Sequence, residues 1–321
     1  MGTVVHVPQT RDMLGEELSG DEAFTALRHY GGRALLVDSF ARFRYADGFS
    51  FARSLGYQVV LGIVPFTIAL VGVTVTMHTE SLGRAIELSL AGVVPGASAG
   101  LVGDALADTR RSAGADTAGA IAMWLGLGFA ILNLASAMGQ IERGCNRIYG
   151  IERDRPFLAK YGRAVLLAVS AGLPLGAGFL VIVAGPEIGE AVTRALHWPP
   201  SLLTWWRPLH LPFGVLLAAL ASAVIFRWAP RRVQPGYTWL VFGSGIHLLL
   251  WVAATWLLGL YVGGSGSFGA VYGSLAAFVA LLLWANVTGI ALFLGIAFAA
   301  QLEAARAGIT EPVHPDPGPG T

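Results

Sequence analysis

The amino-acid sequence predicts an all-α membrane protein with six transmembrane helices, and three observations lead to this fold class. Of its 321 residues, 55% are hydrophobic and only 13% are charged, whereas a soluble domain usually carries about 25% charged residues. Several apolar runs reach roughly 20 residues, which is the length that a helix needs to cross a bilayer. Lys and Arg gather in every second segment between these runs, as in a chain that crosses a membrane repeatedly.

The first 53 residues precede any apolar run and are predicted to form a cytoplasmic segment. Residues 1–20 lack a periodic pattern, and we expect them to be flexible. Residues 21–45 predict an amphipathic helix, bent or broken at Gly31 and Gly32. This helix either lies on the inner leaflet with its arginines toward lipid phosphates, or packs on the protein's own cytoplasmic face.

The first span is predicted at residues 55–77, and Pro65 should kink it because proline removes a backbone hydrogen bond. Residues 80–117 show two shorter helical patterns separated by a Pro-Gly pair, which predicts amphipathic helices on the outer surface. These helices either cover the outer end of the bundle or cap a soluble ligand. Five further spans are predicted at residues 118–138, 165–184, 211–228, 239–262 and 271–300.

The connection 186–209 is expected on the outer side, because its three tryptophans suit the membrane interface. Together the six spans define a transmembrane domain at residues 54–305. The remaining residues, 306–321, are rich in Pro and Gly and predict a disordered cytoplasmic tail.

The stretch 140–163 sets the orientation of the whole chain. It holds six of the 21 Lys and Arg residues, and a basic connection of this kind normally stays in the cytoplasm. With six spans, the inner segments hold 16 of the 21 and the outer segments only five. Both termini are therefore predicted to lie in the cytoplasm.

Polar residues within the predicted spans are the first candidates for a functional role, because such groups are costly in hydrocarbon. They either line a polar path between helices or simply hydrogen-bond one helix to the next. The candidate path consists of Tyr57, Gln58, Asn133, Gln140, His247 and Asn286.

The basic inner loop supplies a second set of candidates, which could contact anionic phospholipid headgroups because Arg forms bidentate bonds to phosphate. The alternative is that these residues fix topology and fold the loop. They are Asn146, Arg147, Tyr149 and Arg155.

The residue pattern argues against enzymatic chemistry and against a metal site or cofactor. Cys145 is the single cysteine, and the seven histidines form no HxH or HxxxH pair. No Asp or Glu lies within a predicted span to orient His247 as part of a triad. The glycine-rich turn 263–269 is not followed by GK[ST], so it is no P-loop. The net charge of +1 gives no reason to expect nucleic acid as a partner.

Three stretches resemble the YihY/BrkB family of bacterial inner-membrane proteins. The first is CNRIYGIERDRPF at 145–157, and the second is ARSLGYQVVLGIVPF at 52–66, which places Tyr57 eight residues before Pro65. The third is the closing helix, YGSLAAFVALLLWANVTGIALFLG at 272–295. One departure is Ala297, at a position that is often acidic in the family.

The resemblance implies a six-helix bundle in the bacterial inner membrane. The family has carried a ribonuclease BN label, but a metal-dependent nuclease needs clustered ligands that this sequence does not show. We expect a transporter or lipid-handling protein that moves an amphiphile or small solute without ATP hydrolysis. The alternative is a membrane scaffold for envelope partners. Membrane lipids are the expected partners; the sequence indicates no substrate, coupling ion or oligomeric state.

Overall fold

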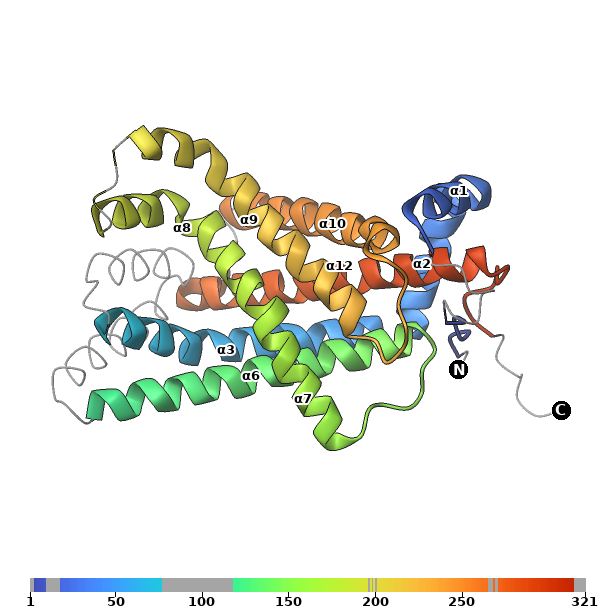
Figure 1. Ribbon diagram of the computed structural model, residues 1–321, viewed down its shortest axis with the longest axis horizontal. Coiled ribbons are helices and arrows are strands. Elements are labelled where there is room, and N and C mark those ends of the chain that lie inside the picture. The colour runs from blue at the N-terminus through green and yellow to red at the C-terminus, as the bar shows by residue number, and fades with distance from the viewer. Residues whose placement is uncertain are drawn as a thin grey trace.

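The computed structural model describes residues 3–9, 18–76, 118–195, 197, 199, 201–264, 268 and 271–314. Within these ranges all regular secondary structure is helical (Figure 1). The one β-type contact there is an isolated bridge. The α-helices are α1 (Gly20–Tyr30), α2 (Gly32–Tyr45), α3 (Gly48–Thr76), α6 (Ala118–Ile148), α7 (Phe157–Leu167), α8 (Leu173–Ala195), α9 (Ser201–Trp228), α10 (Tyr237–Gly264) and α12 (Ala276–Arg306).

The long helices pack as three antiparallel pairs: α3 with α6, α8 with α9, and α10 with α12 (Figure 1). Helix α12 also packs along α3 and so joins two of the pairs. Small residues allow this close approach. A Cβ at Gly56 of α3 would lie 2.9 Å from the backbone nitrogen of Asn286 in α12. Gly178 and Gly214 have the same role where α8 meets α9.

Five stretches within the described ranges are long and apolar enough to cross a membrane. They confirm an all-α membrane protein with several spans. The predicted first span falls in α3, a 29-residue helix with Pro65 inside it, but most of its side chains beyond Gly62 lie outside the described residues. The five stretches are residues 124–148, 157–182, 201–228, 237–262 and 278–306.

Several predicted connections are helical in the structure. The predicted outer connection 186–209 is largely helical, because α8 continues through Pro186 to Ala195 and α9 begins at Ser201. Helix α9 also contains Pro208 and Pro212, since prolines are tolerated in membrane helices where neighbours satisfy the backbone.

The basic connection is also shorter than predicted. Helix α6 extends to Ile148 because Ile141, Cys145 and Ile148 lie one turn apart and are all buried. A π-helical turn, η2 (Ala168–Gly172), then links α7 to α8. The predicted third span is thus α7, η2 and α8 in succession.

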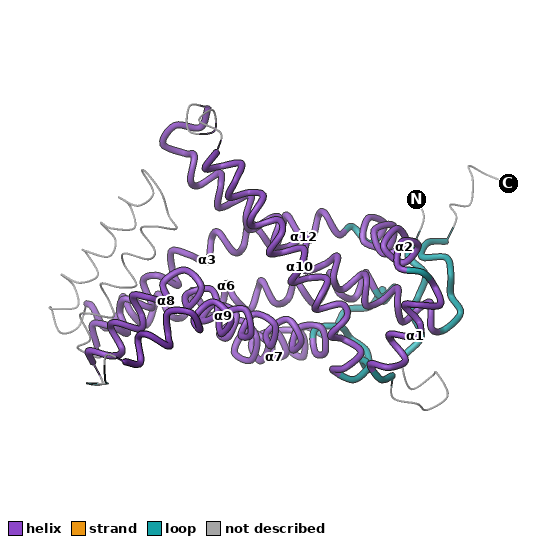
Figure 2. Tube along the Cα trace, turned by 90° about the horizontal axis from the view of Figure 1, so that it is seen from above, coloured by secondary structure: helices purple, strands orange, loops and turns teal. Residues whose placement is uncertain are grey.

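The amino-terminal helix is broken where the sequence predicted. Gly31 has φ +88° and separates α1 from α2. Helix α2 runs across the direction of α3 and α12 in Figure 1 and is seen close to end-on in Figure 2. The predicted outer-surface helices of residues 80–117 lie outside the described residues.

The two ends of the chain meet at the end of the bundle that also holds α1 and α2 (Figure 1). Val4 and Val313 form the isolated bridge, and the His314 nitrogen donates a 2.9 Å hydrogen bond to the Thr3 carbonyl. The predicted disorder of residues 306–321 is therefore wrong as far as His314, and residues 3–9 are ordered as well. Burial explains both differences, because Val7 is completely buried and Ile309 packs against the core.

Candidate functional site

Two of the candidate path residues meet between α3 and α6. The Asn133 Nδ2 atom donates a 2.8 Å hydrogen bond to the backbone carbonyl of Gln58. Gly62, about one turn further along α3, makes room for this amide, since a Cβ there would collide with it. The Gln58 Oε1 atom is buried without a hydrogen-bond partner. A partly satisfied polar patch therefore lies between these helices.

Asn286 and His247 lie on opposite sides of α12. The backbone of Asn286 contacts Gly56 of α3, whereas Gly295 of α12 packs against His247 of α10. Gly295 lies nine positions after Asn286, which is two and a half helical turns and therefore the opposite side of the helix. His247 is buried and its Nδ1 atom has no hydrogen-bond partner. The candidate path residues thus form two separate groups and do not line one continuous path.

The remaining two path candidates do not join either group. The Tyr57 side chain is 59% exposed, so it faces away from the helix contacts around Gln58. Gln140 is half-buried near the inner end of α6. The structure therefore gathers Gln58, Asn133 and Asn286 around α3 and leaves Tyr57, Gln140 and His247 apart from them.

Three of the four headgroup candidates are engaged within the protein. Asn146 is buried, donates to Asp154 Oδ1 at 3.2 Å and accepts from the Arg231 nitrogen at 2.7 Å. Tyr149 is also buried, with the Arg232 guanidinium 4.5 Å from its ring centroid. Both side chains hold the inner loop against the connection between α9 and α10.

Arg155 joins the same two connections. Its Nη1 atom lies 2.8 Å from Glu142 Oε1, and its guanidinium donates to the carbonyls of Ala229 and Pro230 at 3.0 Å. Glu142 is completely buried, so this pair neutralises its charge inside the protein. Arg147 is the one headgroup candidate with an exposed side chain.

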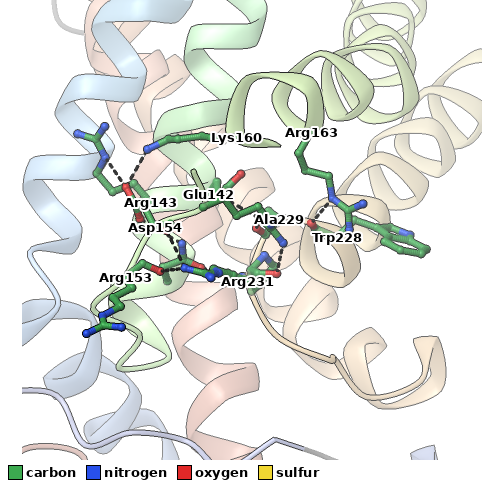
Figure 3. A network of polar contacts seen from close by, with 12 residues as sticks. Glu142, Arg143, Arg153, Asp154, Lys160, Arg163, Trp228, Ala229 and Arg231 are labelled. Carbon is green, nitrogen blue, oxygen red and sulfur yellow. Dashed lines mark hydrogen bonds and ion pairs between the residues drawn. The ribbon is translucent and has the colours of Figure 1, made fainter. Parts of the chain in front are cut away.

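Asp154 lies at the centre of the network in Figure 3. This network connects α6, the inner loop and α7. The Asp154 Oδ2 atom accepts from Lys160 at 2.8 Å and lies 3.5 Å from Arg143 Nε. Arg231 donates to the carbonyls of Arg153 and Asp154 at 3.1 and 2.7 Å. The inner loop is therefore bound to α6 and α7 on one side and to the α9–α10 connection on the other.

This network should make part of the stability depend on pH. Burial raises the pKa of the Asp154 carboxyl, but the hydrogen bonds from Lys160 and Asn146 outweigh burial and lower the pKa below its ordinary value. A carboxyl with a depressed pKa stabilises the fold above its unfolded-state pKa, and this stabilisation disappears as pH falls through the folded-state pKa.

We therefore expect Asp154→Asn to lower the melting temperature in detergent at neutral pH. The difference from the wild type should begin to shrink as pH falls below about 4, the ordinary pKa of an unfolded Asp, and should disappear at lower pH once the folded carboxyl is protonated. Glu152→Gln, on an exposed neighbour in the same loop, is the control. A difference that stays constant from neutral to acid pH would contradict this role of the Asp154 charge.

A buried charged cluster that the sequence pattern did not predict lies at the same end of the bundle. Arg42 of α2 donates from Nε to Gln301 Oε1 at 2.8 Å, and from Nη1 to the carbonyls of Val5 and Ile148. Arg232 pairs with Glu303 of α12 and donates to the Pro8 carbonyl. We call Arg42, Tyr149, Arg232, Gln301 and Glu303 the inner cluster.

Each member of the inner cluster is almost fully buried. Burial lowers the pKa of Arg42 to about 10, although nearby Tyr149 and Glu303 oppose this. Arg42 Nη2 and two nitrogens of Arg232 have no hydrogen-bond partner. The cluster joins the amino-terminal segment, α2, the inner loop, the α9–α10 connection and α12 at one point.

A signal for the inner cluster is present in the sequence. Gln301 and Glu303 interrupt an otherwise apolar run near the end of α12, and such residues usually face protein and not lipid. The arginines near this end indicate topology in the sequence, but the sequence does not show that Arg42 and Arg232 are buried. Ala297, at the position that is often acidic in relatives, is itself fully buried.

Within the described ranges, no three His, Cys, Asp or Glu side chains gather in a way that could hold a metal ion.

The model of the family described as virulence factor BrkB matches residues 39–317. The chain belongs to the BrkB family. It is 23% identical to the ribonuclease-like protein YfkH of Bacillus subtilis over 82% of this chain and 92% of that protein. It is 26% identical to a UPF0761 membrane protein of Chromohalobacter salexigens, over 83% of this chain and 62% of the relative. No solved structure shows significant similarity to it.

The BrkB match contains the whole inner cluster, from Arg42 to Glu303. It also contains Gln58, Asn133 and Asn286. This BrkB-family chain spans about 62% of the UPF0761 relatives that it matches, including one from Azotobacter vinelandii. The likeness to the longer relatives therefore covers only part of their length.

Proposed function

We propose that this BrkB-family protein crosses the bacterial inner membrane six times, with both termini in the cytoplasm. In this proposal α3 is the first span in chain order, in addition to the five stretches given above. The length of α3 supports this count, since 29 residues exceed what a bilayer requires. The arginine-rich loops and both chain ends lie at one end of the bundle (Figure 1), which we take as the cytoplasmic end.

We propose further that the protein moves an amphiphile or small solute across the membrane without ATP hydrolysis, enzymatic chemistry or a cofactor. Buried polar atoms without partners, within the spans, carry this proposal. Gln58 Oε1 lies between α3 and α6, and His247 Nδ1 and Ser244 Oγ lie in α10. Groups of this kind are expensive in a membrane, and they commonly mark a substrate path.

The patch around α3 is the better candidate for the contact with substrate. Gln58 and Asn133 belong to one helix pair and Asn286 to a neighbouring helix, so the three residues border the junction of α3, α6 and α12. When a lipid passes this junction, its polar headgroup would exchange water for contacts with the amide side chains. The acyl chains of the lipid would stay among the exposed apolar side chains of the helices. The energy would come from the concentration difference of the substrate alone.

Translocation of phospholipid in liposomes tests this function. With dye-labelled lipid in both leaflets and a membrane-impermeant quencher outside, the wild type should cause loss of the inner-leaflet signal. Gln58→Leu and Asn133→Leu should each slow this loss several-fold, because an apolar side chain offers the headgroup no hydrogen bond.

Thr288→Val is the matched control. It removes a polar group from α12 that accepts a hydrogen bond from Trp251 Nε1 at 3.2 Å, away from the α3 patch. This control should translocate like the wild type. Equal rates for empty liposomes and wild-type liposomes would refute lipid movement, and equal rates for wild type and both α3-patch variants would refute the path.

A scaffold for envelope partners is the second candidate. It is favoured by the exposed arginines around the inner loop, Arg143, Arg147 and Arg153, which the internal network leaves accessible to solvent. Reversing Arg147 and Arg153 to Glu should abolish cellular function if recruitment is the role. The same variant should leave translocation in liposomes unchanged if transport is the role.

A further inference from the structure

Helix α2 presents an apolar stripe on its exposed side. Val37 is 62% exposed, and Leu36 and Phe40 beside it are also exposed. Arg33 and Arg44 lie on the same side at the two ends of the helix. The positions 33, 37, 40 and 44 follow the spacing of one helical face. A water-facing helix surface normally carries polar residues here, so this stripe requires an apolar neighbour.

The opposite side of α2 is fixed to the bundle. Leu35, Ser39, Arg42 and Phe43 are all buried, and Arg42 belongs to the inner cluster. Because this side is held by packing and by the hydrogen bonds of Arg42, α2 cannot rotate to hide its apolar stripe. The stripe is therefore a permanent feature of the surface.

The position of α2 relates the stripe to the membrane. The helix lies across the long helices at the end of the bundle that holds the inner loop (Figures 1 and 2). Phe40 makes an edge contact with Phe49 at the start of α3, with ring centroids 6.3 Å apart. Phe49 is itself partly exposed. The apolar surface thus runs without a break from α2 onto a membrane-directed helix.

We infer that α2 lies in the plane of the inner leaflet, with its apolar stripe among the acyl chains and Arg33 and Arg44 bound to anionic phospholipid headgroups. The charges fit this partner. The two arginines are 11 residues apart, or about 16 Å along a helix, so each can reach a separate phosphate while its methylenes cover the stripe. The inference requires the membrane setting of the chain but not its transport activity.

Accessibility of a spin label in nanodiscs tests this contact in the full-length protein. A nitroxide at Val37→Cys should collide readily with oxygen and poorly with a water-soluble nickel chelate, as expected in the acyl region. Cys145 is completely buried and should not compete for the label. The matched control is Thr25→Cys on exposed α1, which should show the reverse preference.

Three further outcomes decide the inference. A label at Val37 as accessible to the nickel chelate as the label at Thr25 would overturn it. Dipolar broadening between labels in discs that hold two copies would instead assign the stripe to a second copy of this chain, and would also overturn it. Replacing both Arg33 and Arg44 with Gln should reduce the phosphatidylglycerol that copurifies with the protein, relative to Arg28→Gln on α1; equal amounts would overturn the role of the arginines.

Discussion

Glu303→Leu should destabilise the protein by about 3–5 kcal/mol, because it leaves the Arg232 guanidinium buried without its carboxylate. The Arg232–Glu303 pair is almost completely buried, and Arg42 adds a second positive charge to the same cluster. Removing the single acid of the inner cluster therefore leaves two positive charges without a counter-charge in a region with little water. Unfolding in mixed micelles, followed by circular dichroism, measures the loss.

The double variant Arg232→Met/Glu303→Leu provides the internal comparison. With both charges removed, the desolvation cost disappears as well, and most of the lost stability should return. Glu22→Gln is the control at a partly exposed pair, where Glu22 and Arg306 are 3.6 Å apart and a loss of only about 0–1 kcal/mol is expected. A double variant less stable than Glu303→Leu would contradict the electrostatic explanation.

Gly56→Leu should be the second damaging change, with a loss of about 3 kcal/mol, at the upper end of the usual cost of overpacking. A Cβ at this position would meet the backbone nitrogen and Cα of Asn286 at 2.9 and 3.1 Å. Backbone atoms cannot move aside as a flexible side chain can, so α3 and α12 must separate. The melting temperature in detergent and the yield of folded protein report the effect.

Gly128→Leu is the control for this change. Gly128 lies within α6, and a Cβ there would meet no atom within 4 Å apart from the adjoining backbone of its own helix. Leucine has a higher helix propensity than glycine, so this variant should be as stable as the wild type or slightly more stable. If Gly128→Leu and Gly56→Leu lost stability equally, close approach of α3 and α12 would not be the cause.

The membrane fold could be predicted because hydropathy and arginine distribution are properties of whole segments. Helix ends could not, because tertiary contacts decide them. Helix α6 continues past its apolar run since Ile141, Cys145 and Ile148 find a buried surface there. The predicted spans stop at residue 184 and resume at residue 211, yet α8 continues through Pro186 and α9 begins before Pro208. Gly31, by contrast, broke the amino-terminal helix as predicted, because a positive φ is a local requirement.

The candidate site was harder to predict because a sequence does not show which side of a helix a residue occupies. The sequence shows Gln58 and Asn133 as polar residues in apolar stretches, but their contact depends on the register of α3 against α6. Tyr57, one residue away from Gln58, faces outward. Arg42 was counted with the other inner arginines, although it is the one in α2 that turns inward.

The meeting of the chain ends has a consequence for biogenesis. Thr3 and Val5 contact His314 and Pro312, and Arg42 and Arg232 hold the carbonyls of Val5 and Pro8. Residues 3–8 therefore reach their final contacts only when segments that are synthesised much later are in place. Until the ribosome has released the carboxyl-terminal residues and α12 has been inserted, Arg42 lacks Gln301 and Arg232 lacks Glu303. The inner cluster can thus form only after α12 has been synthesised, and a protein truncated before Gln301 would expose these arginines to quality control.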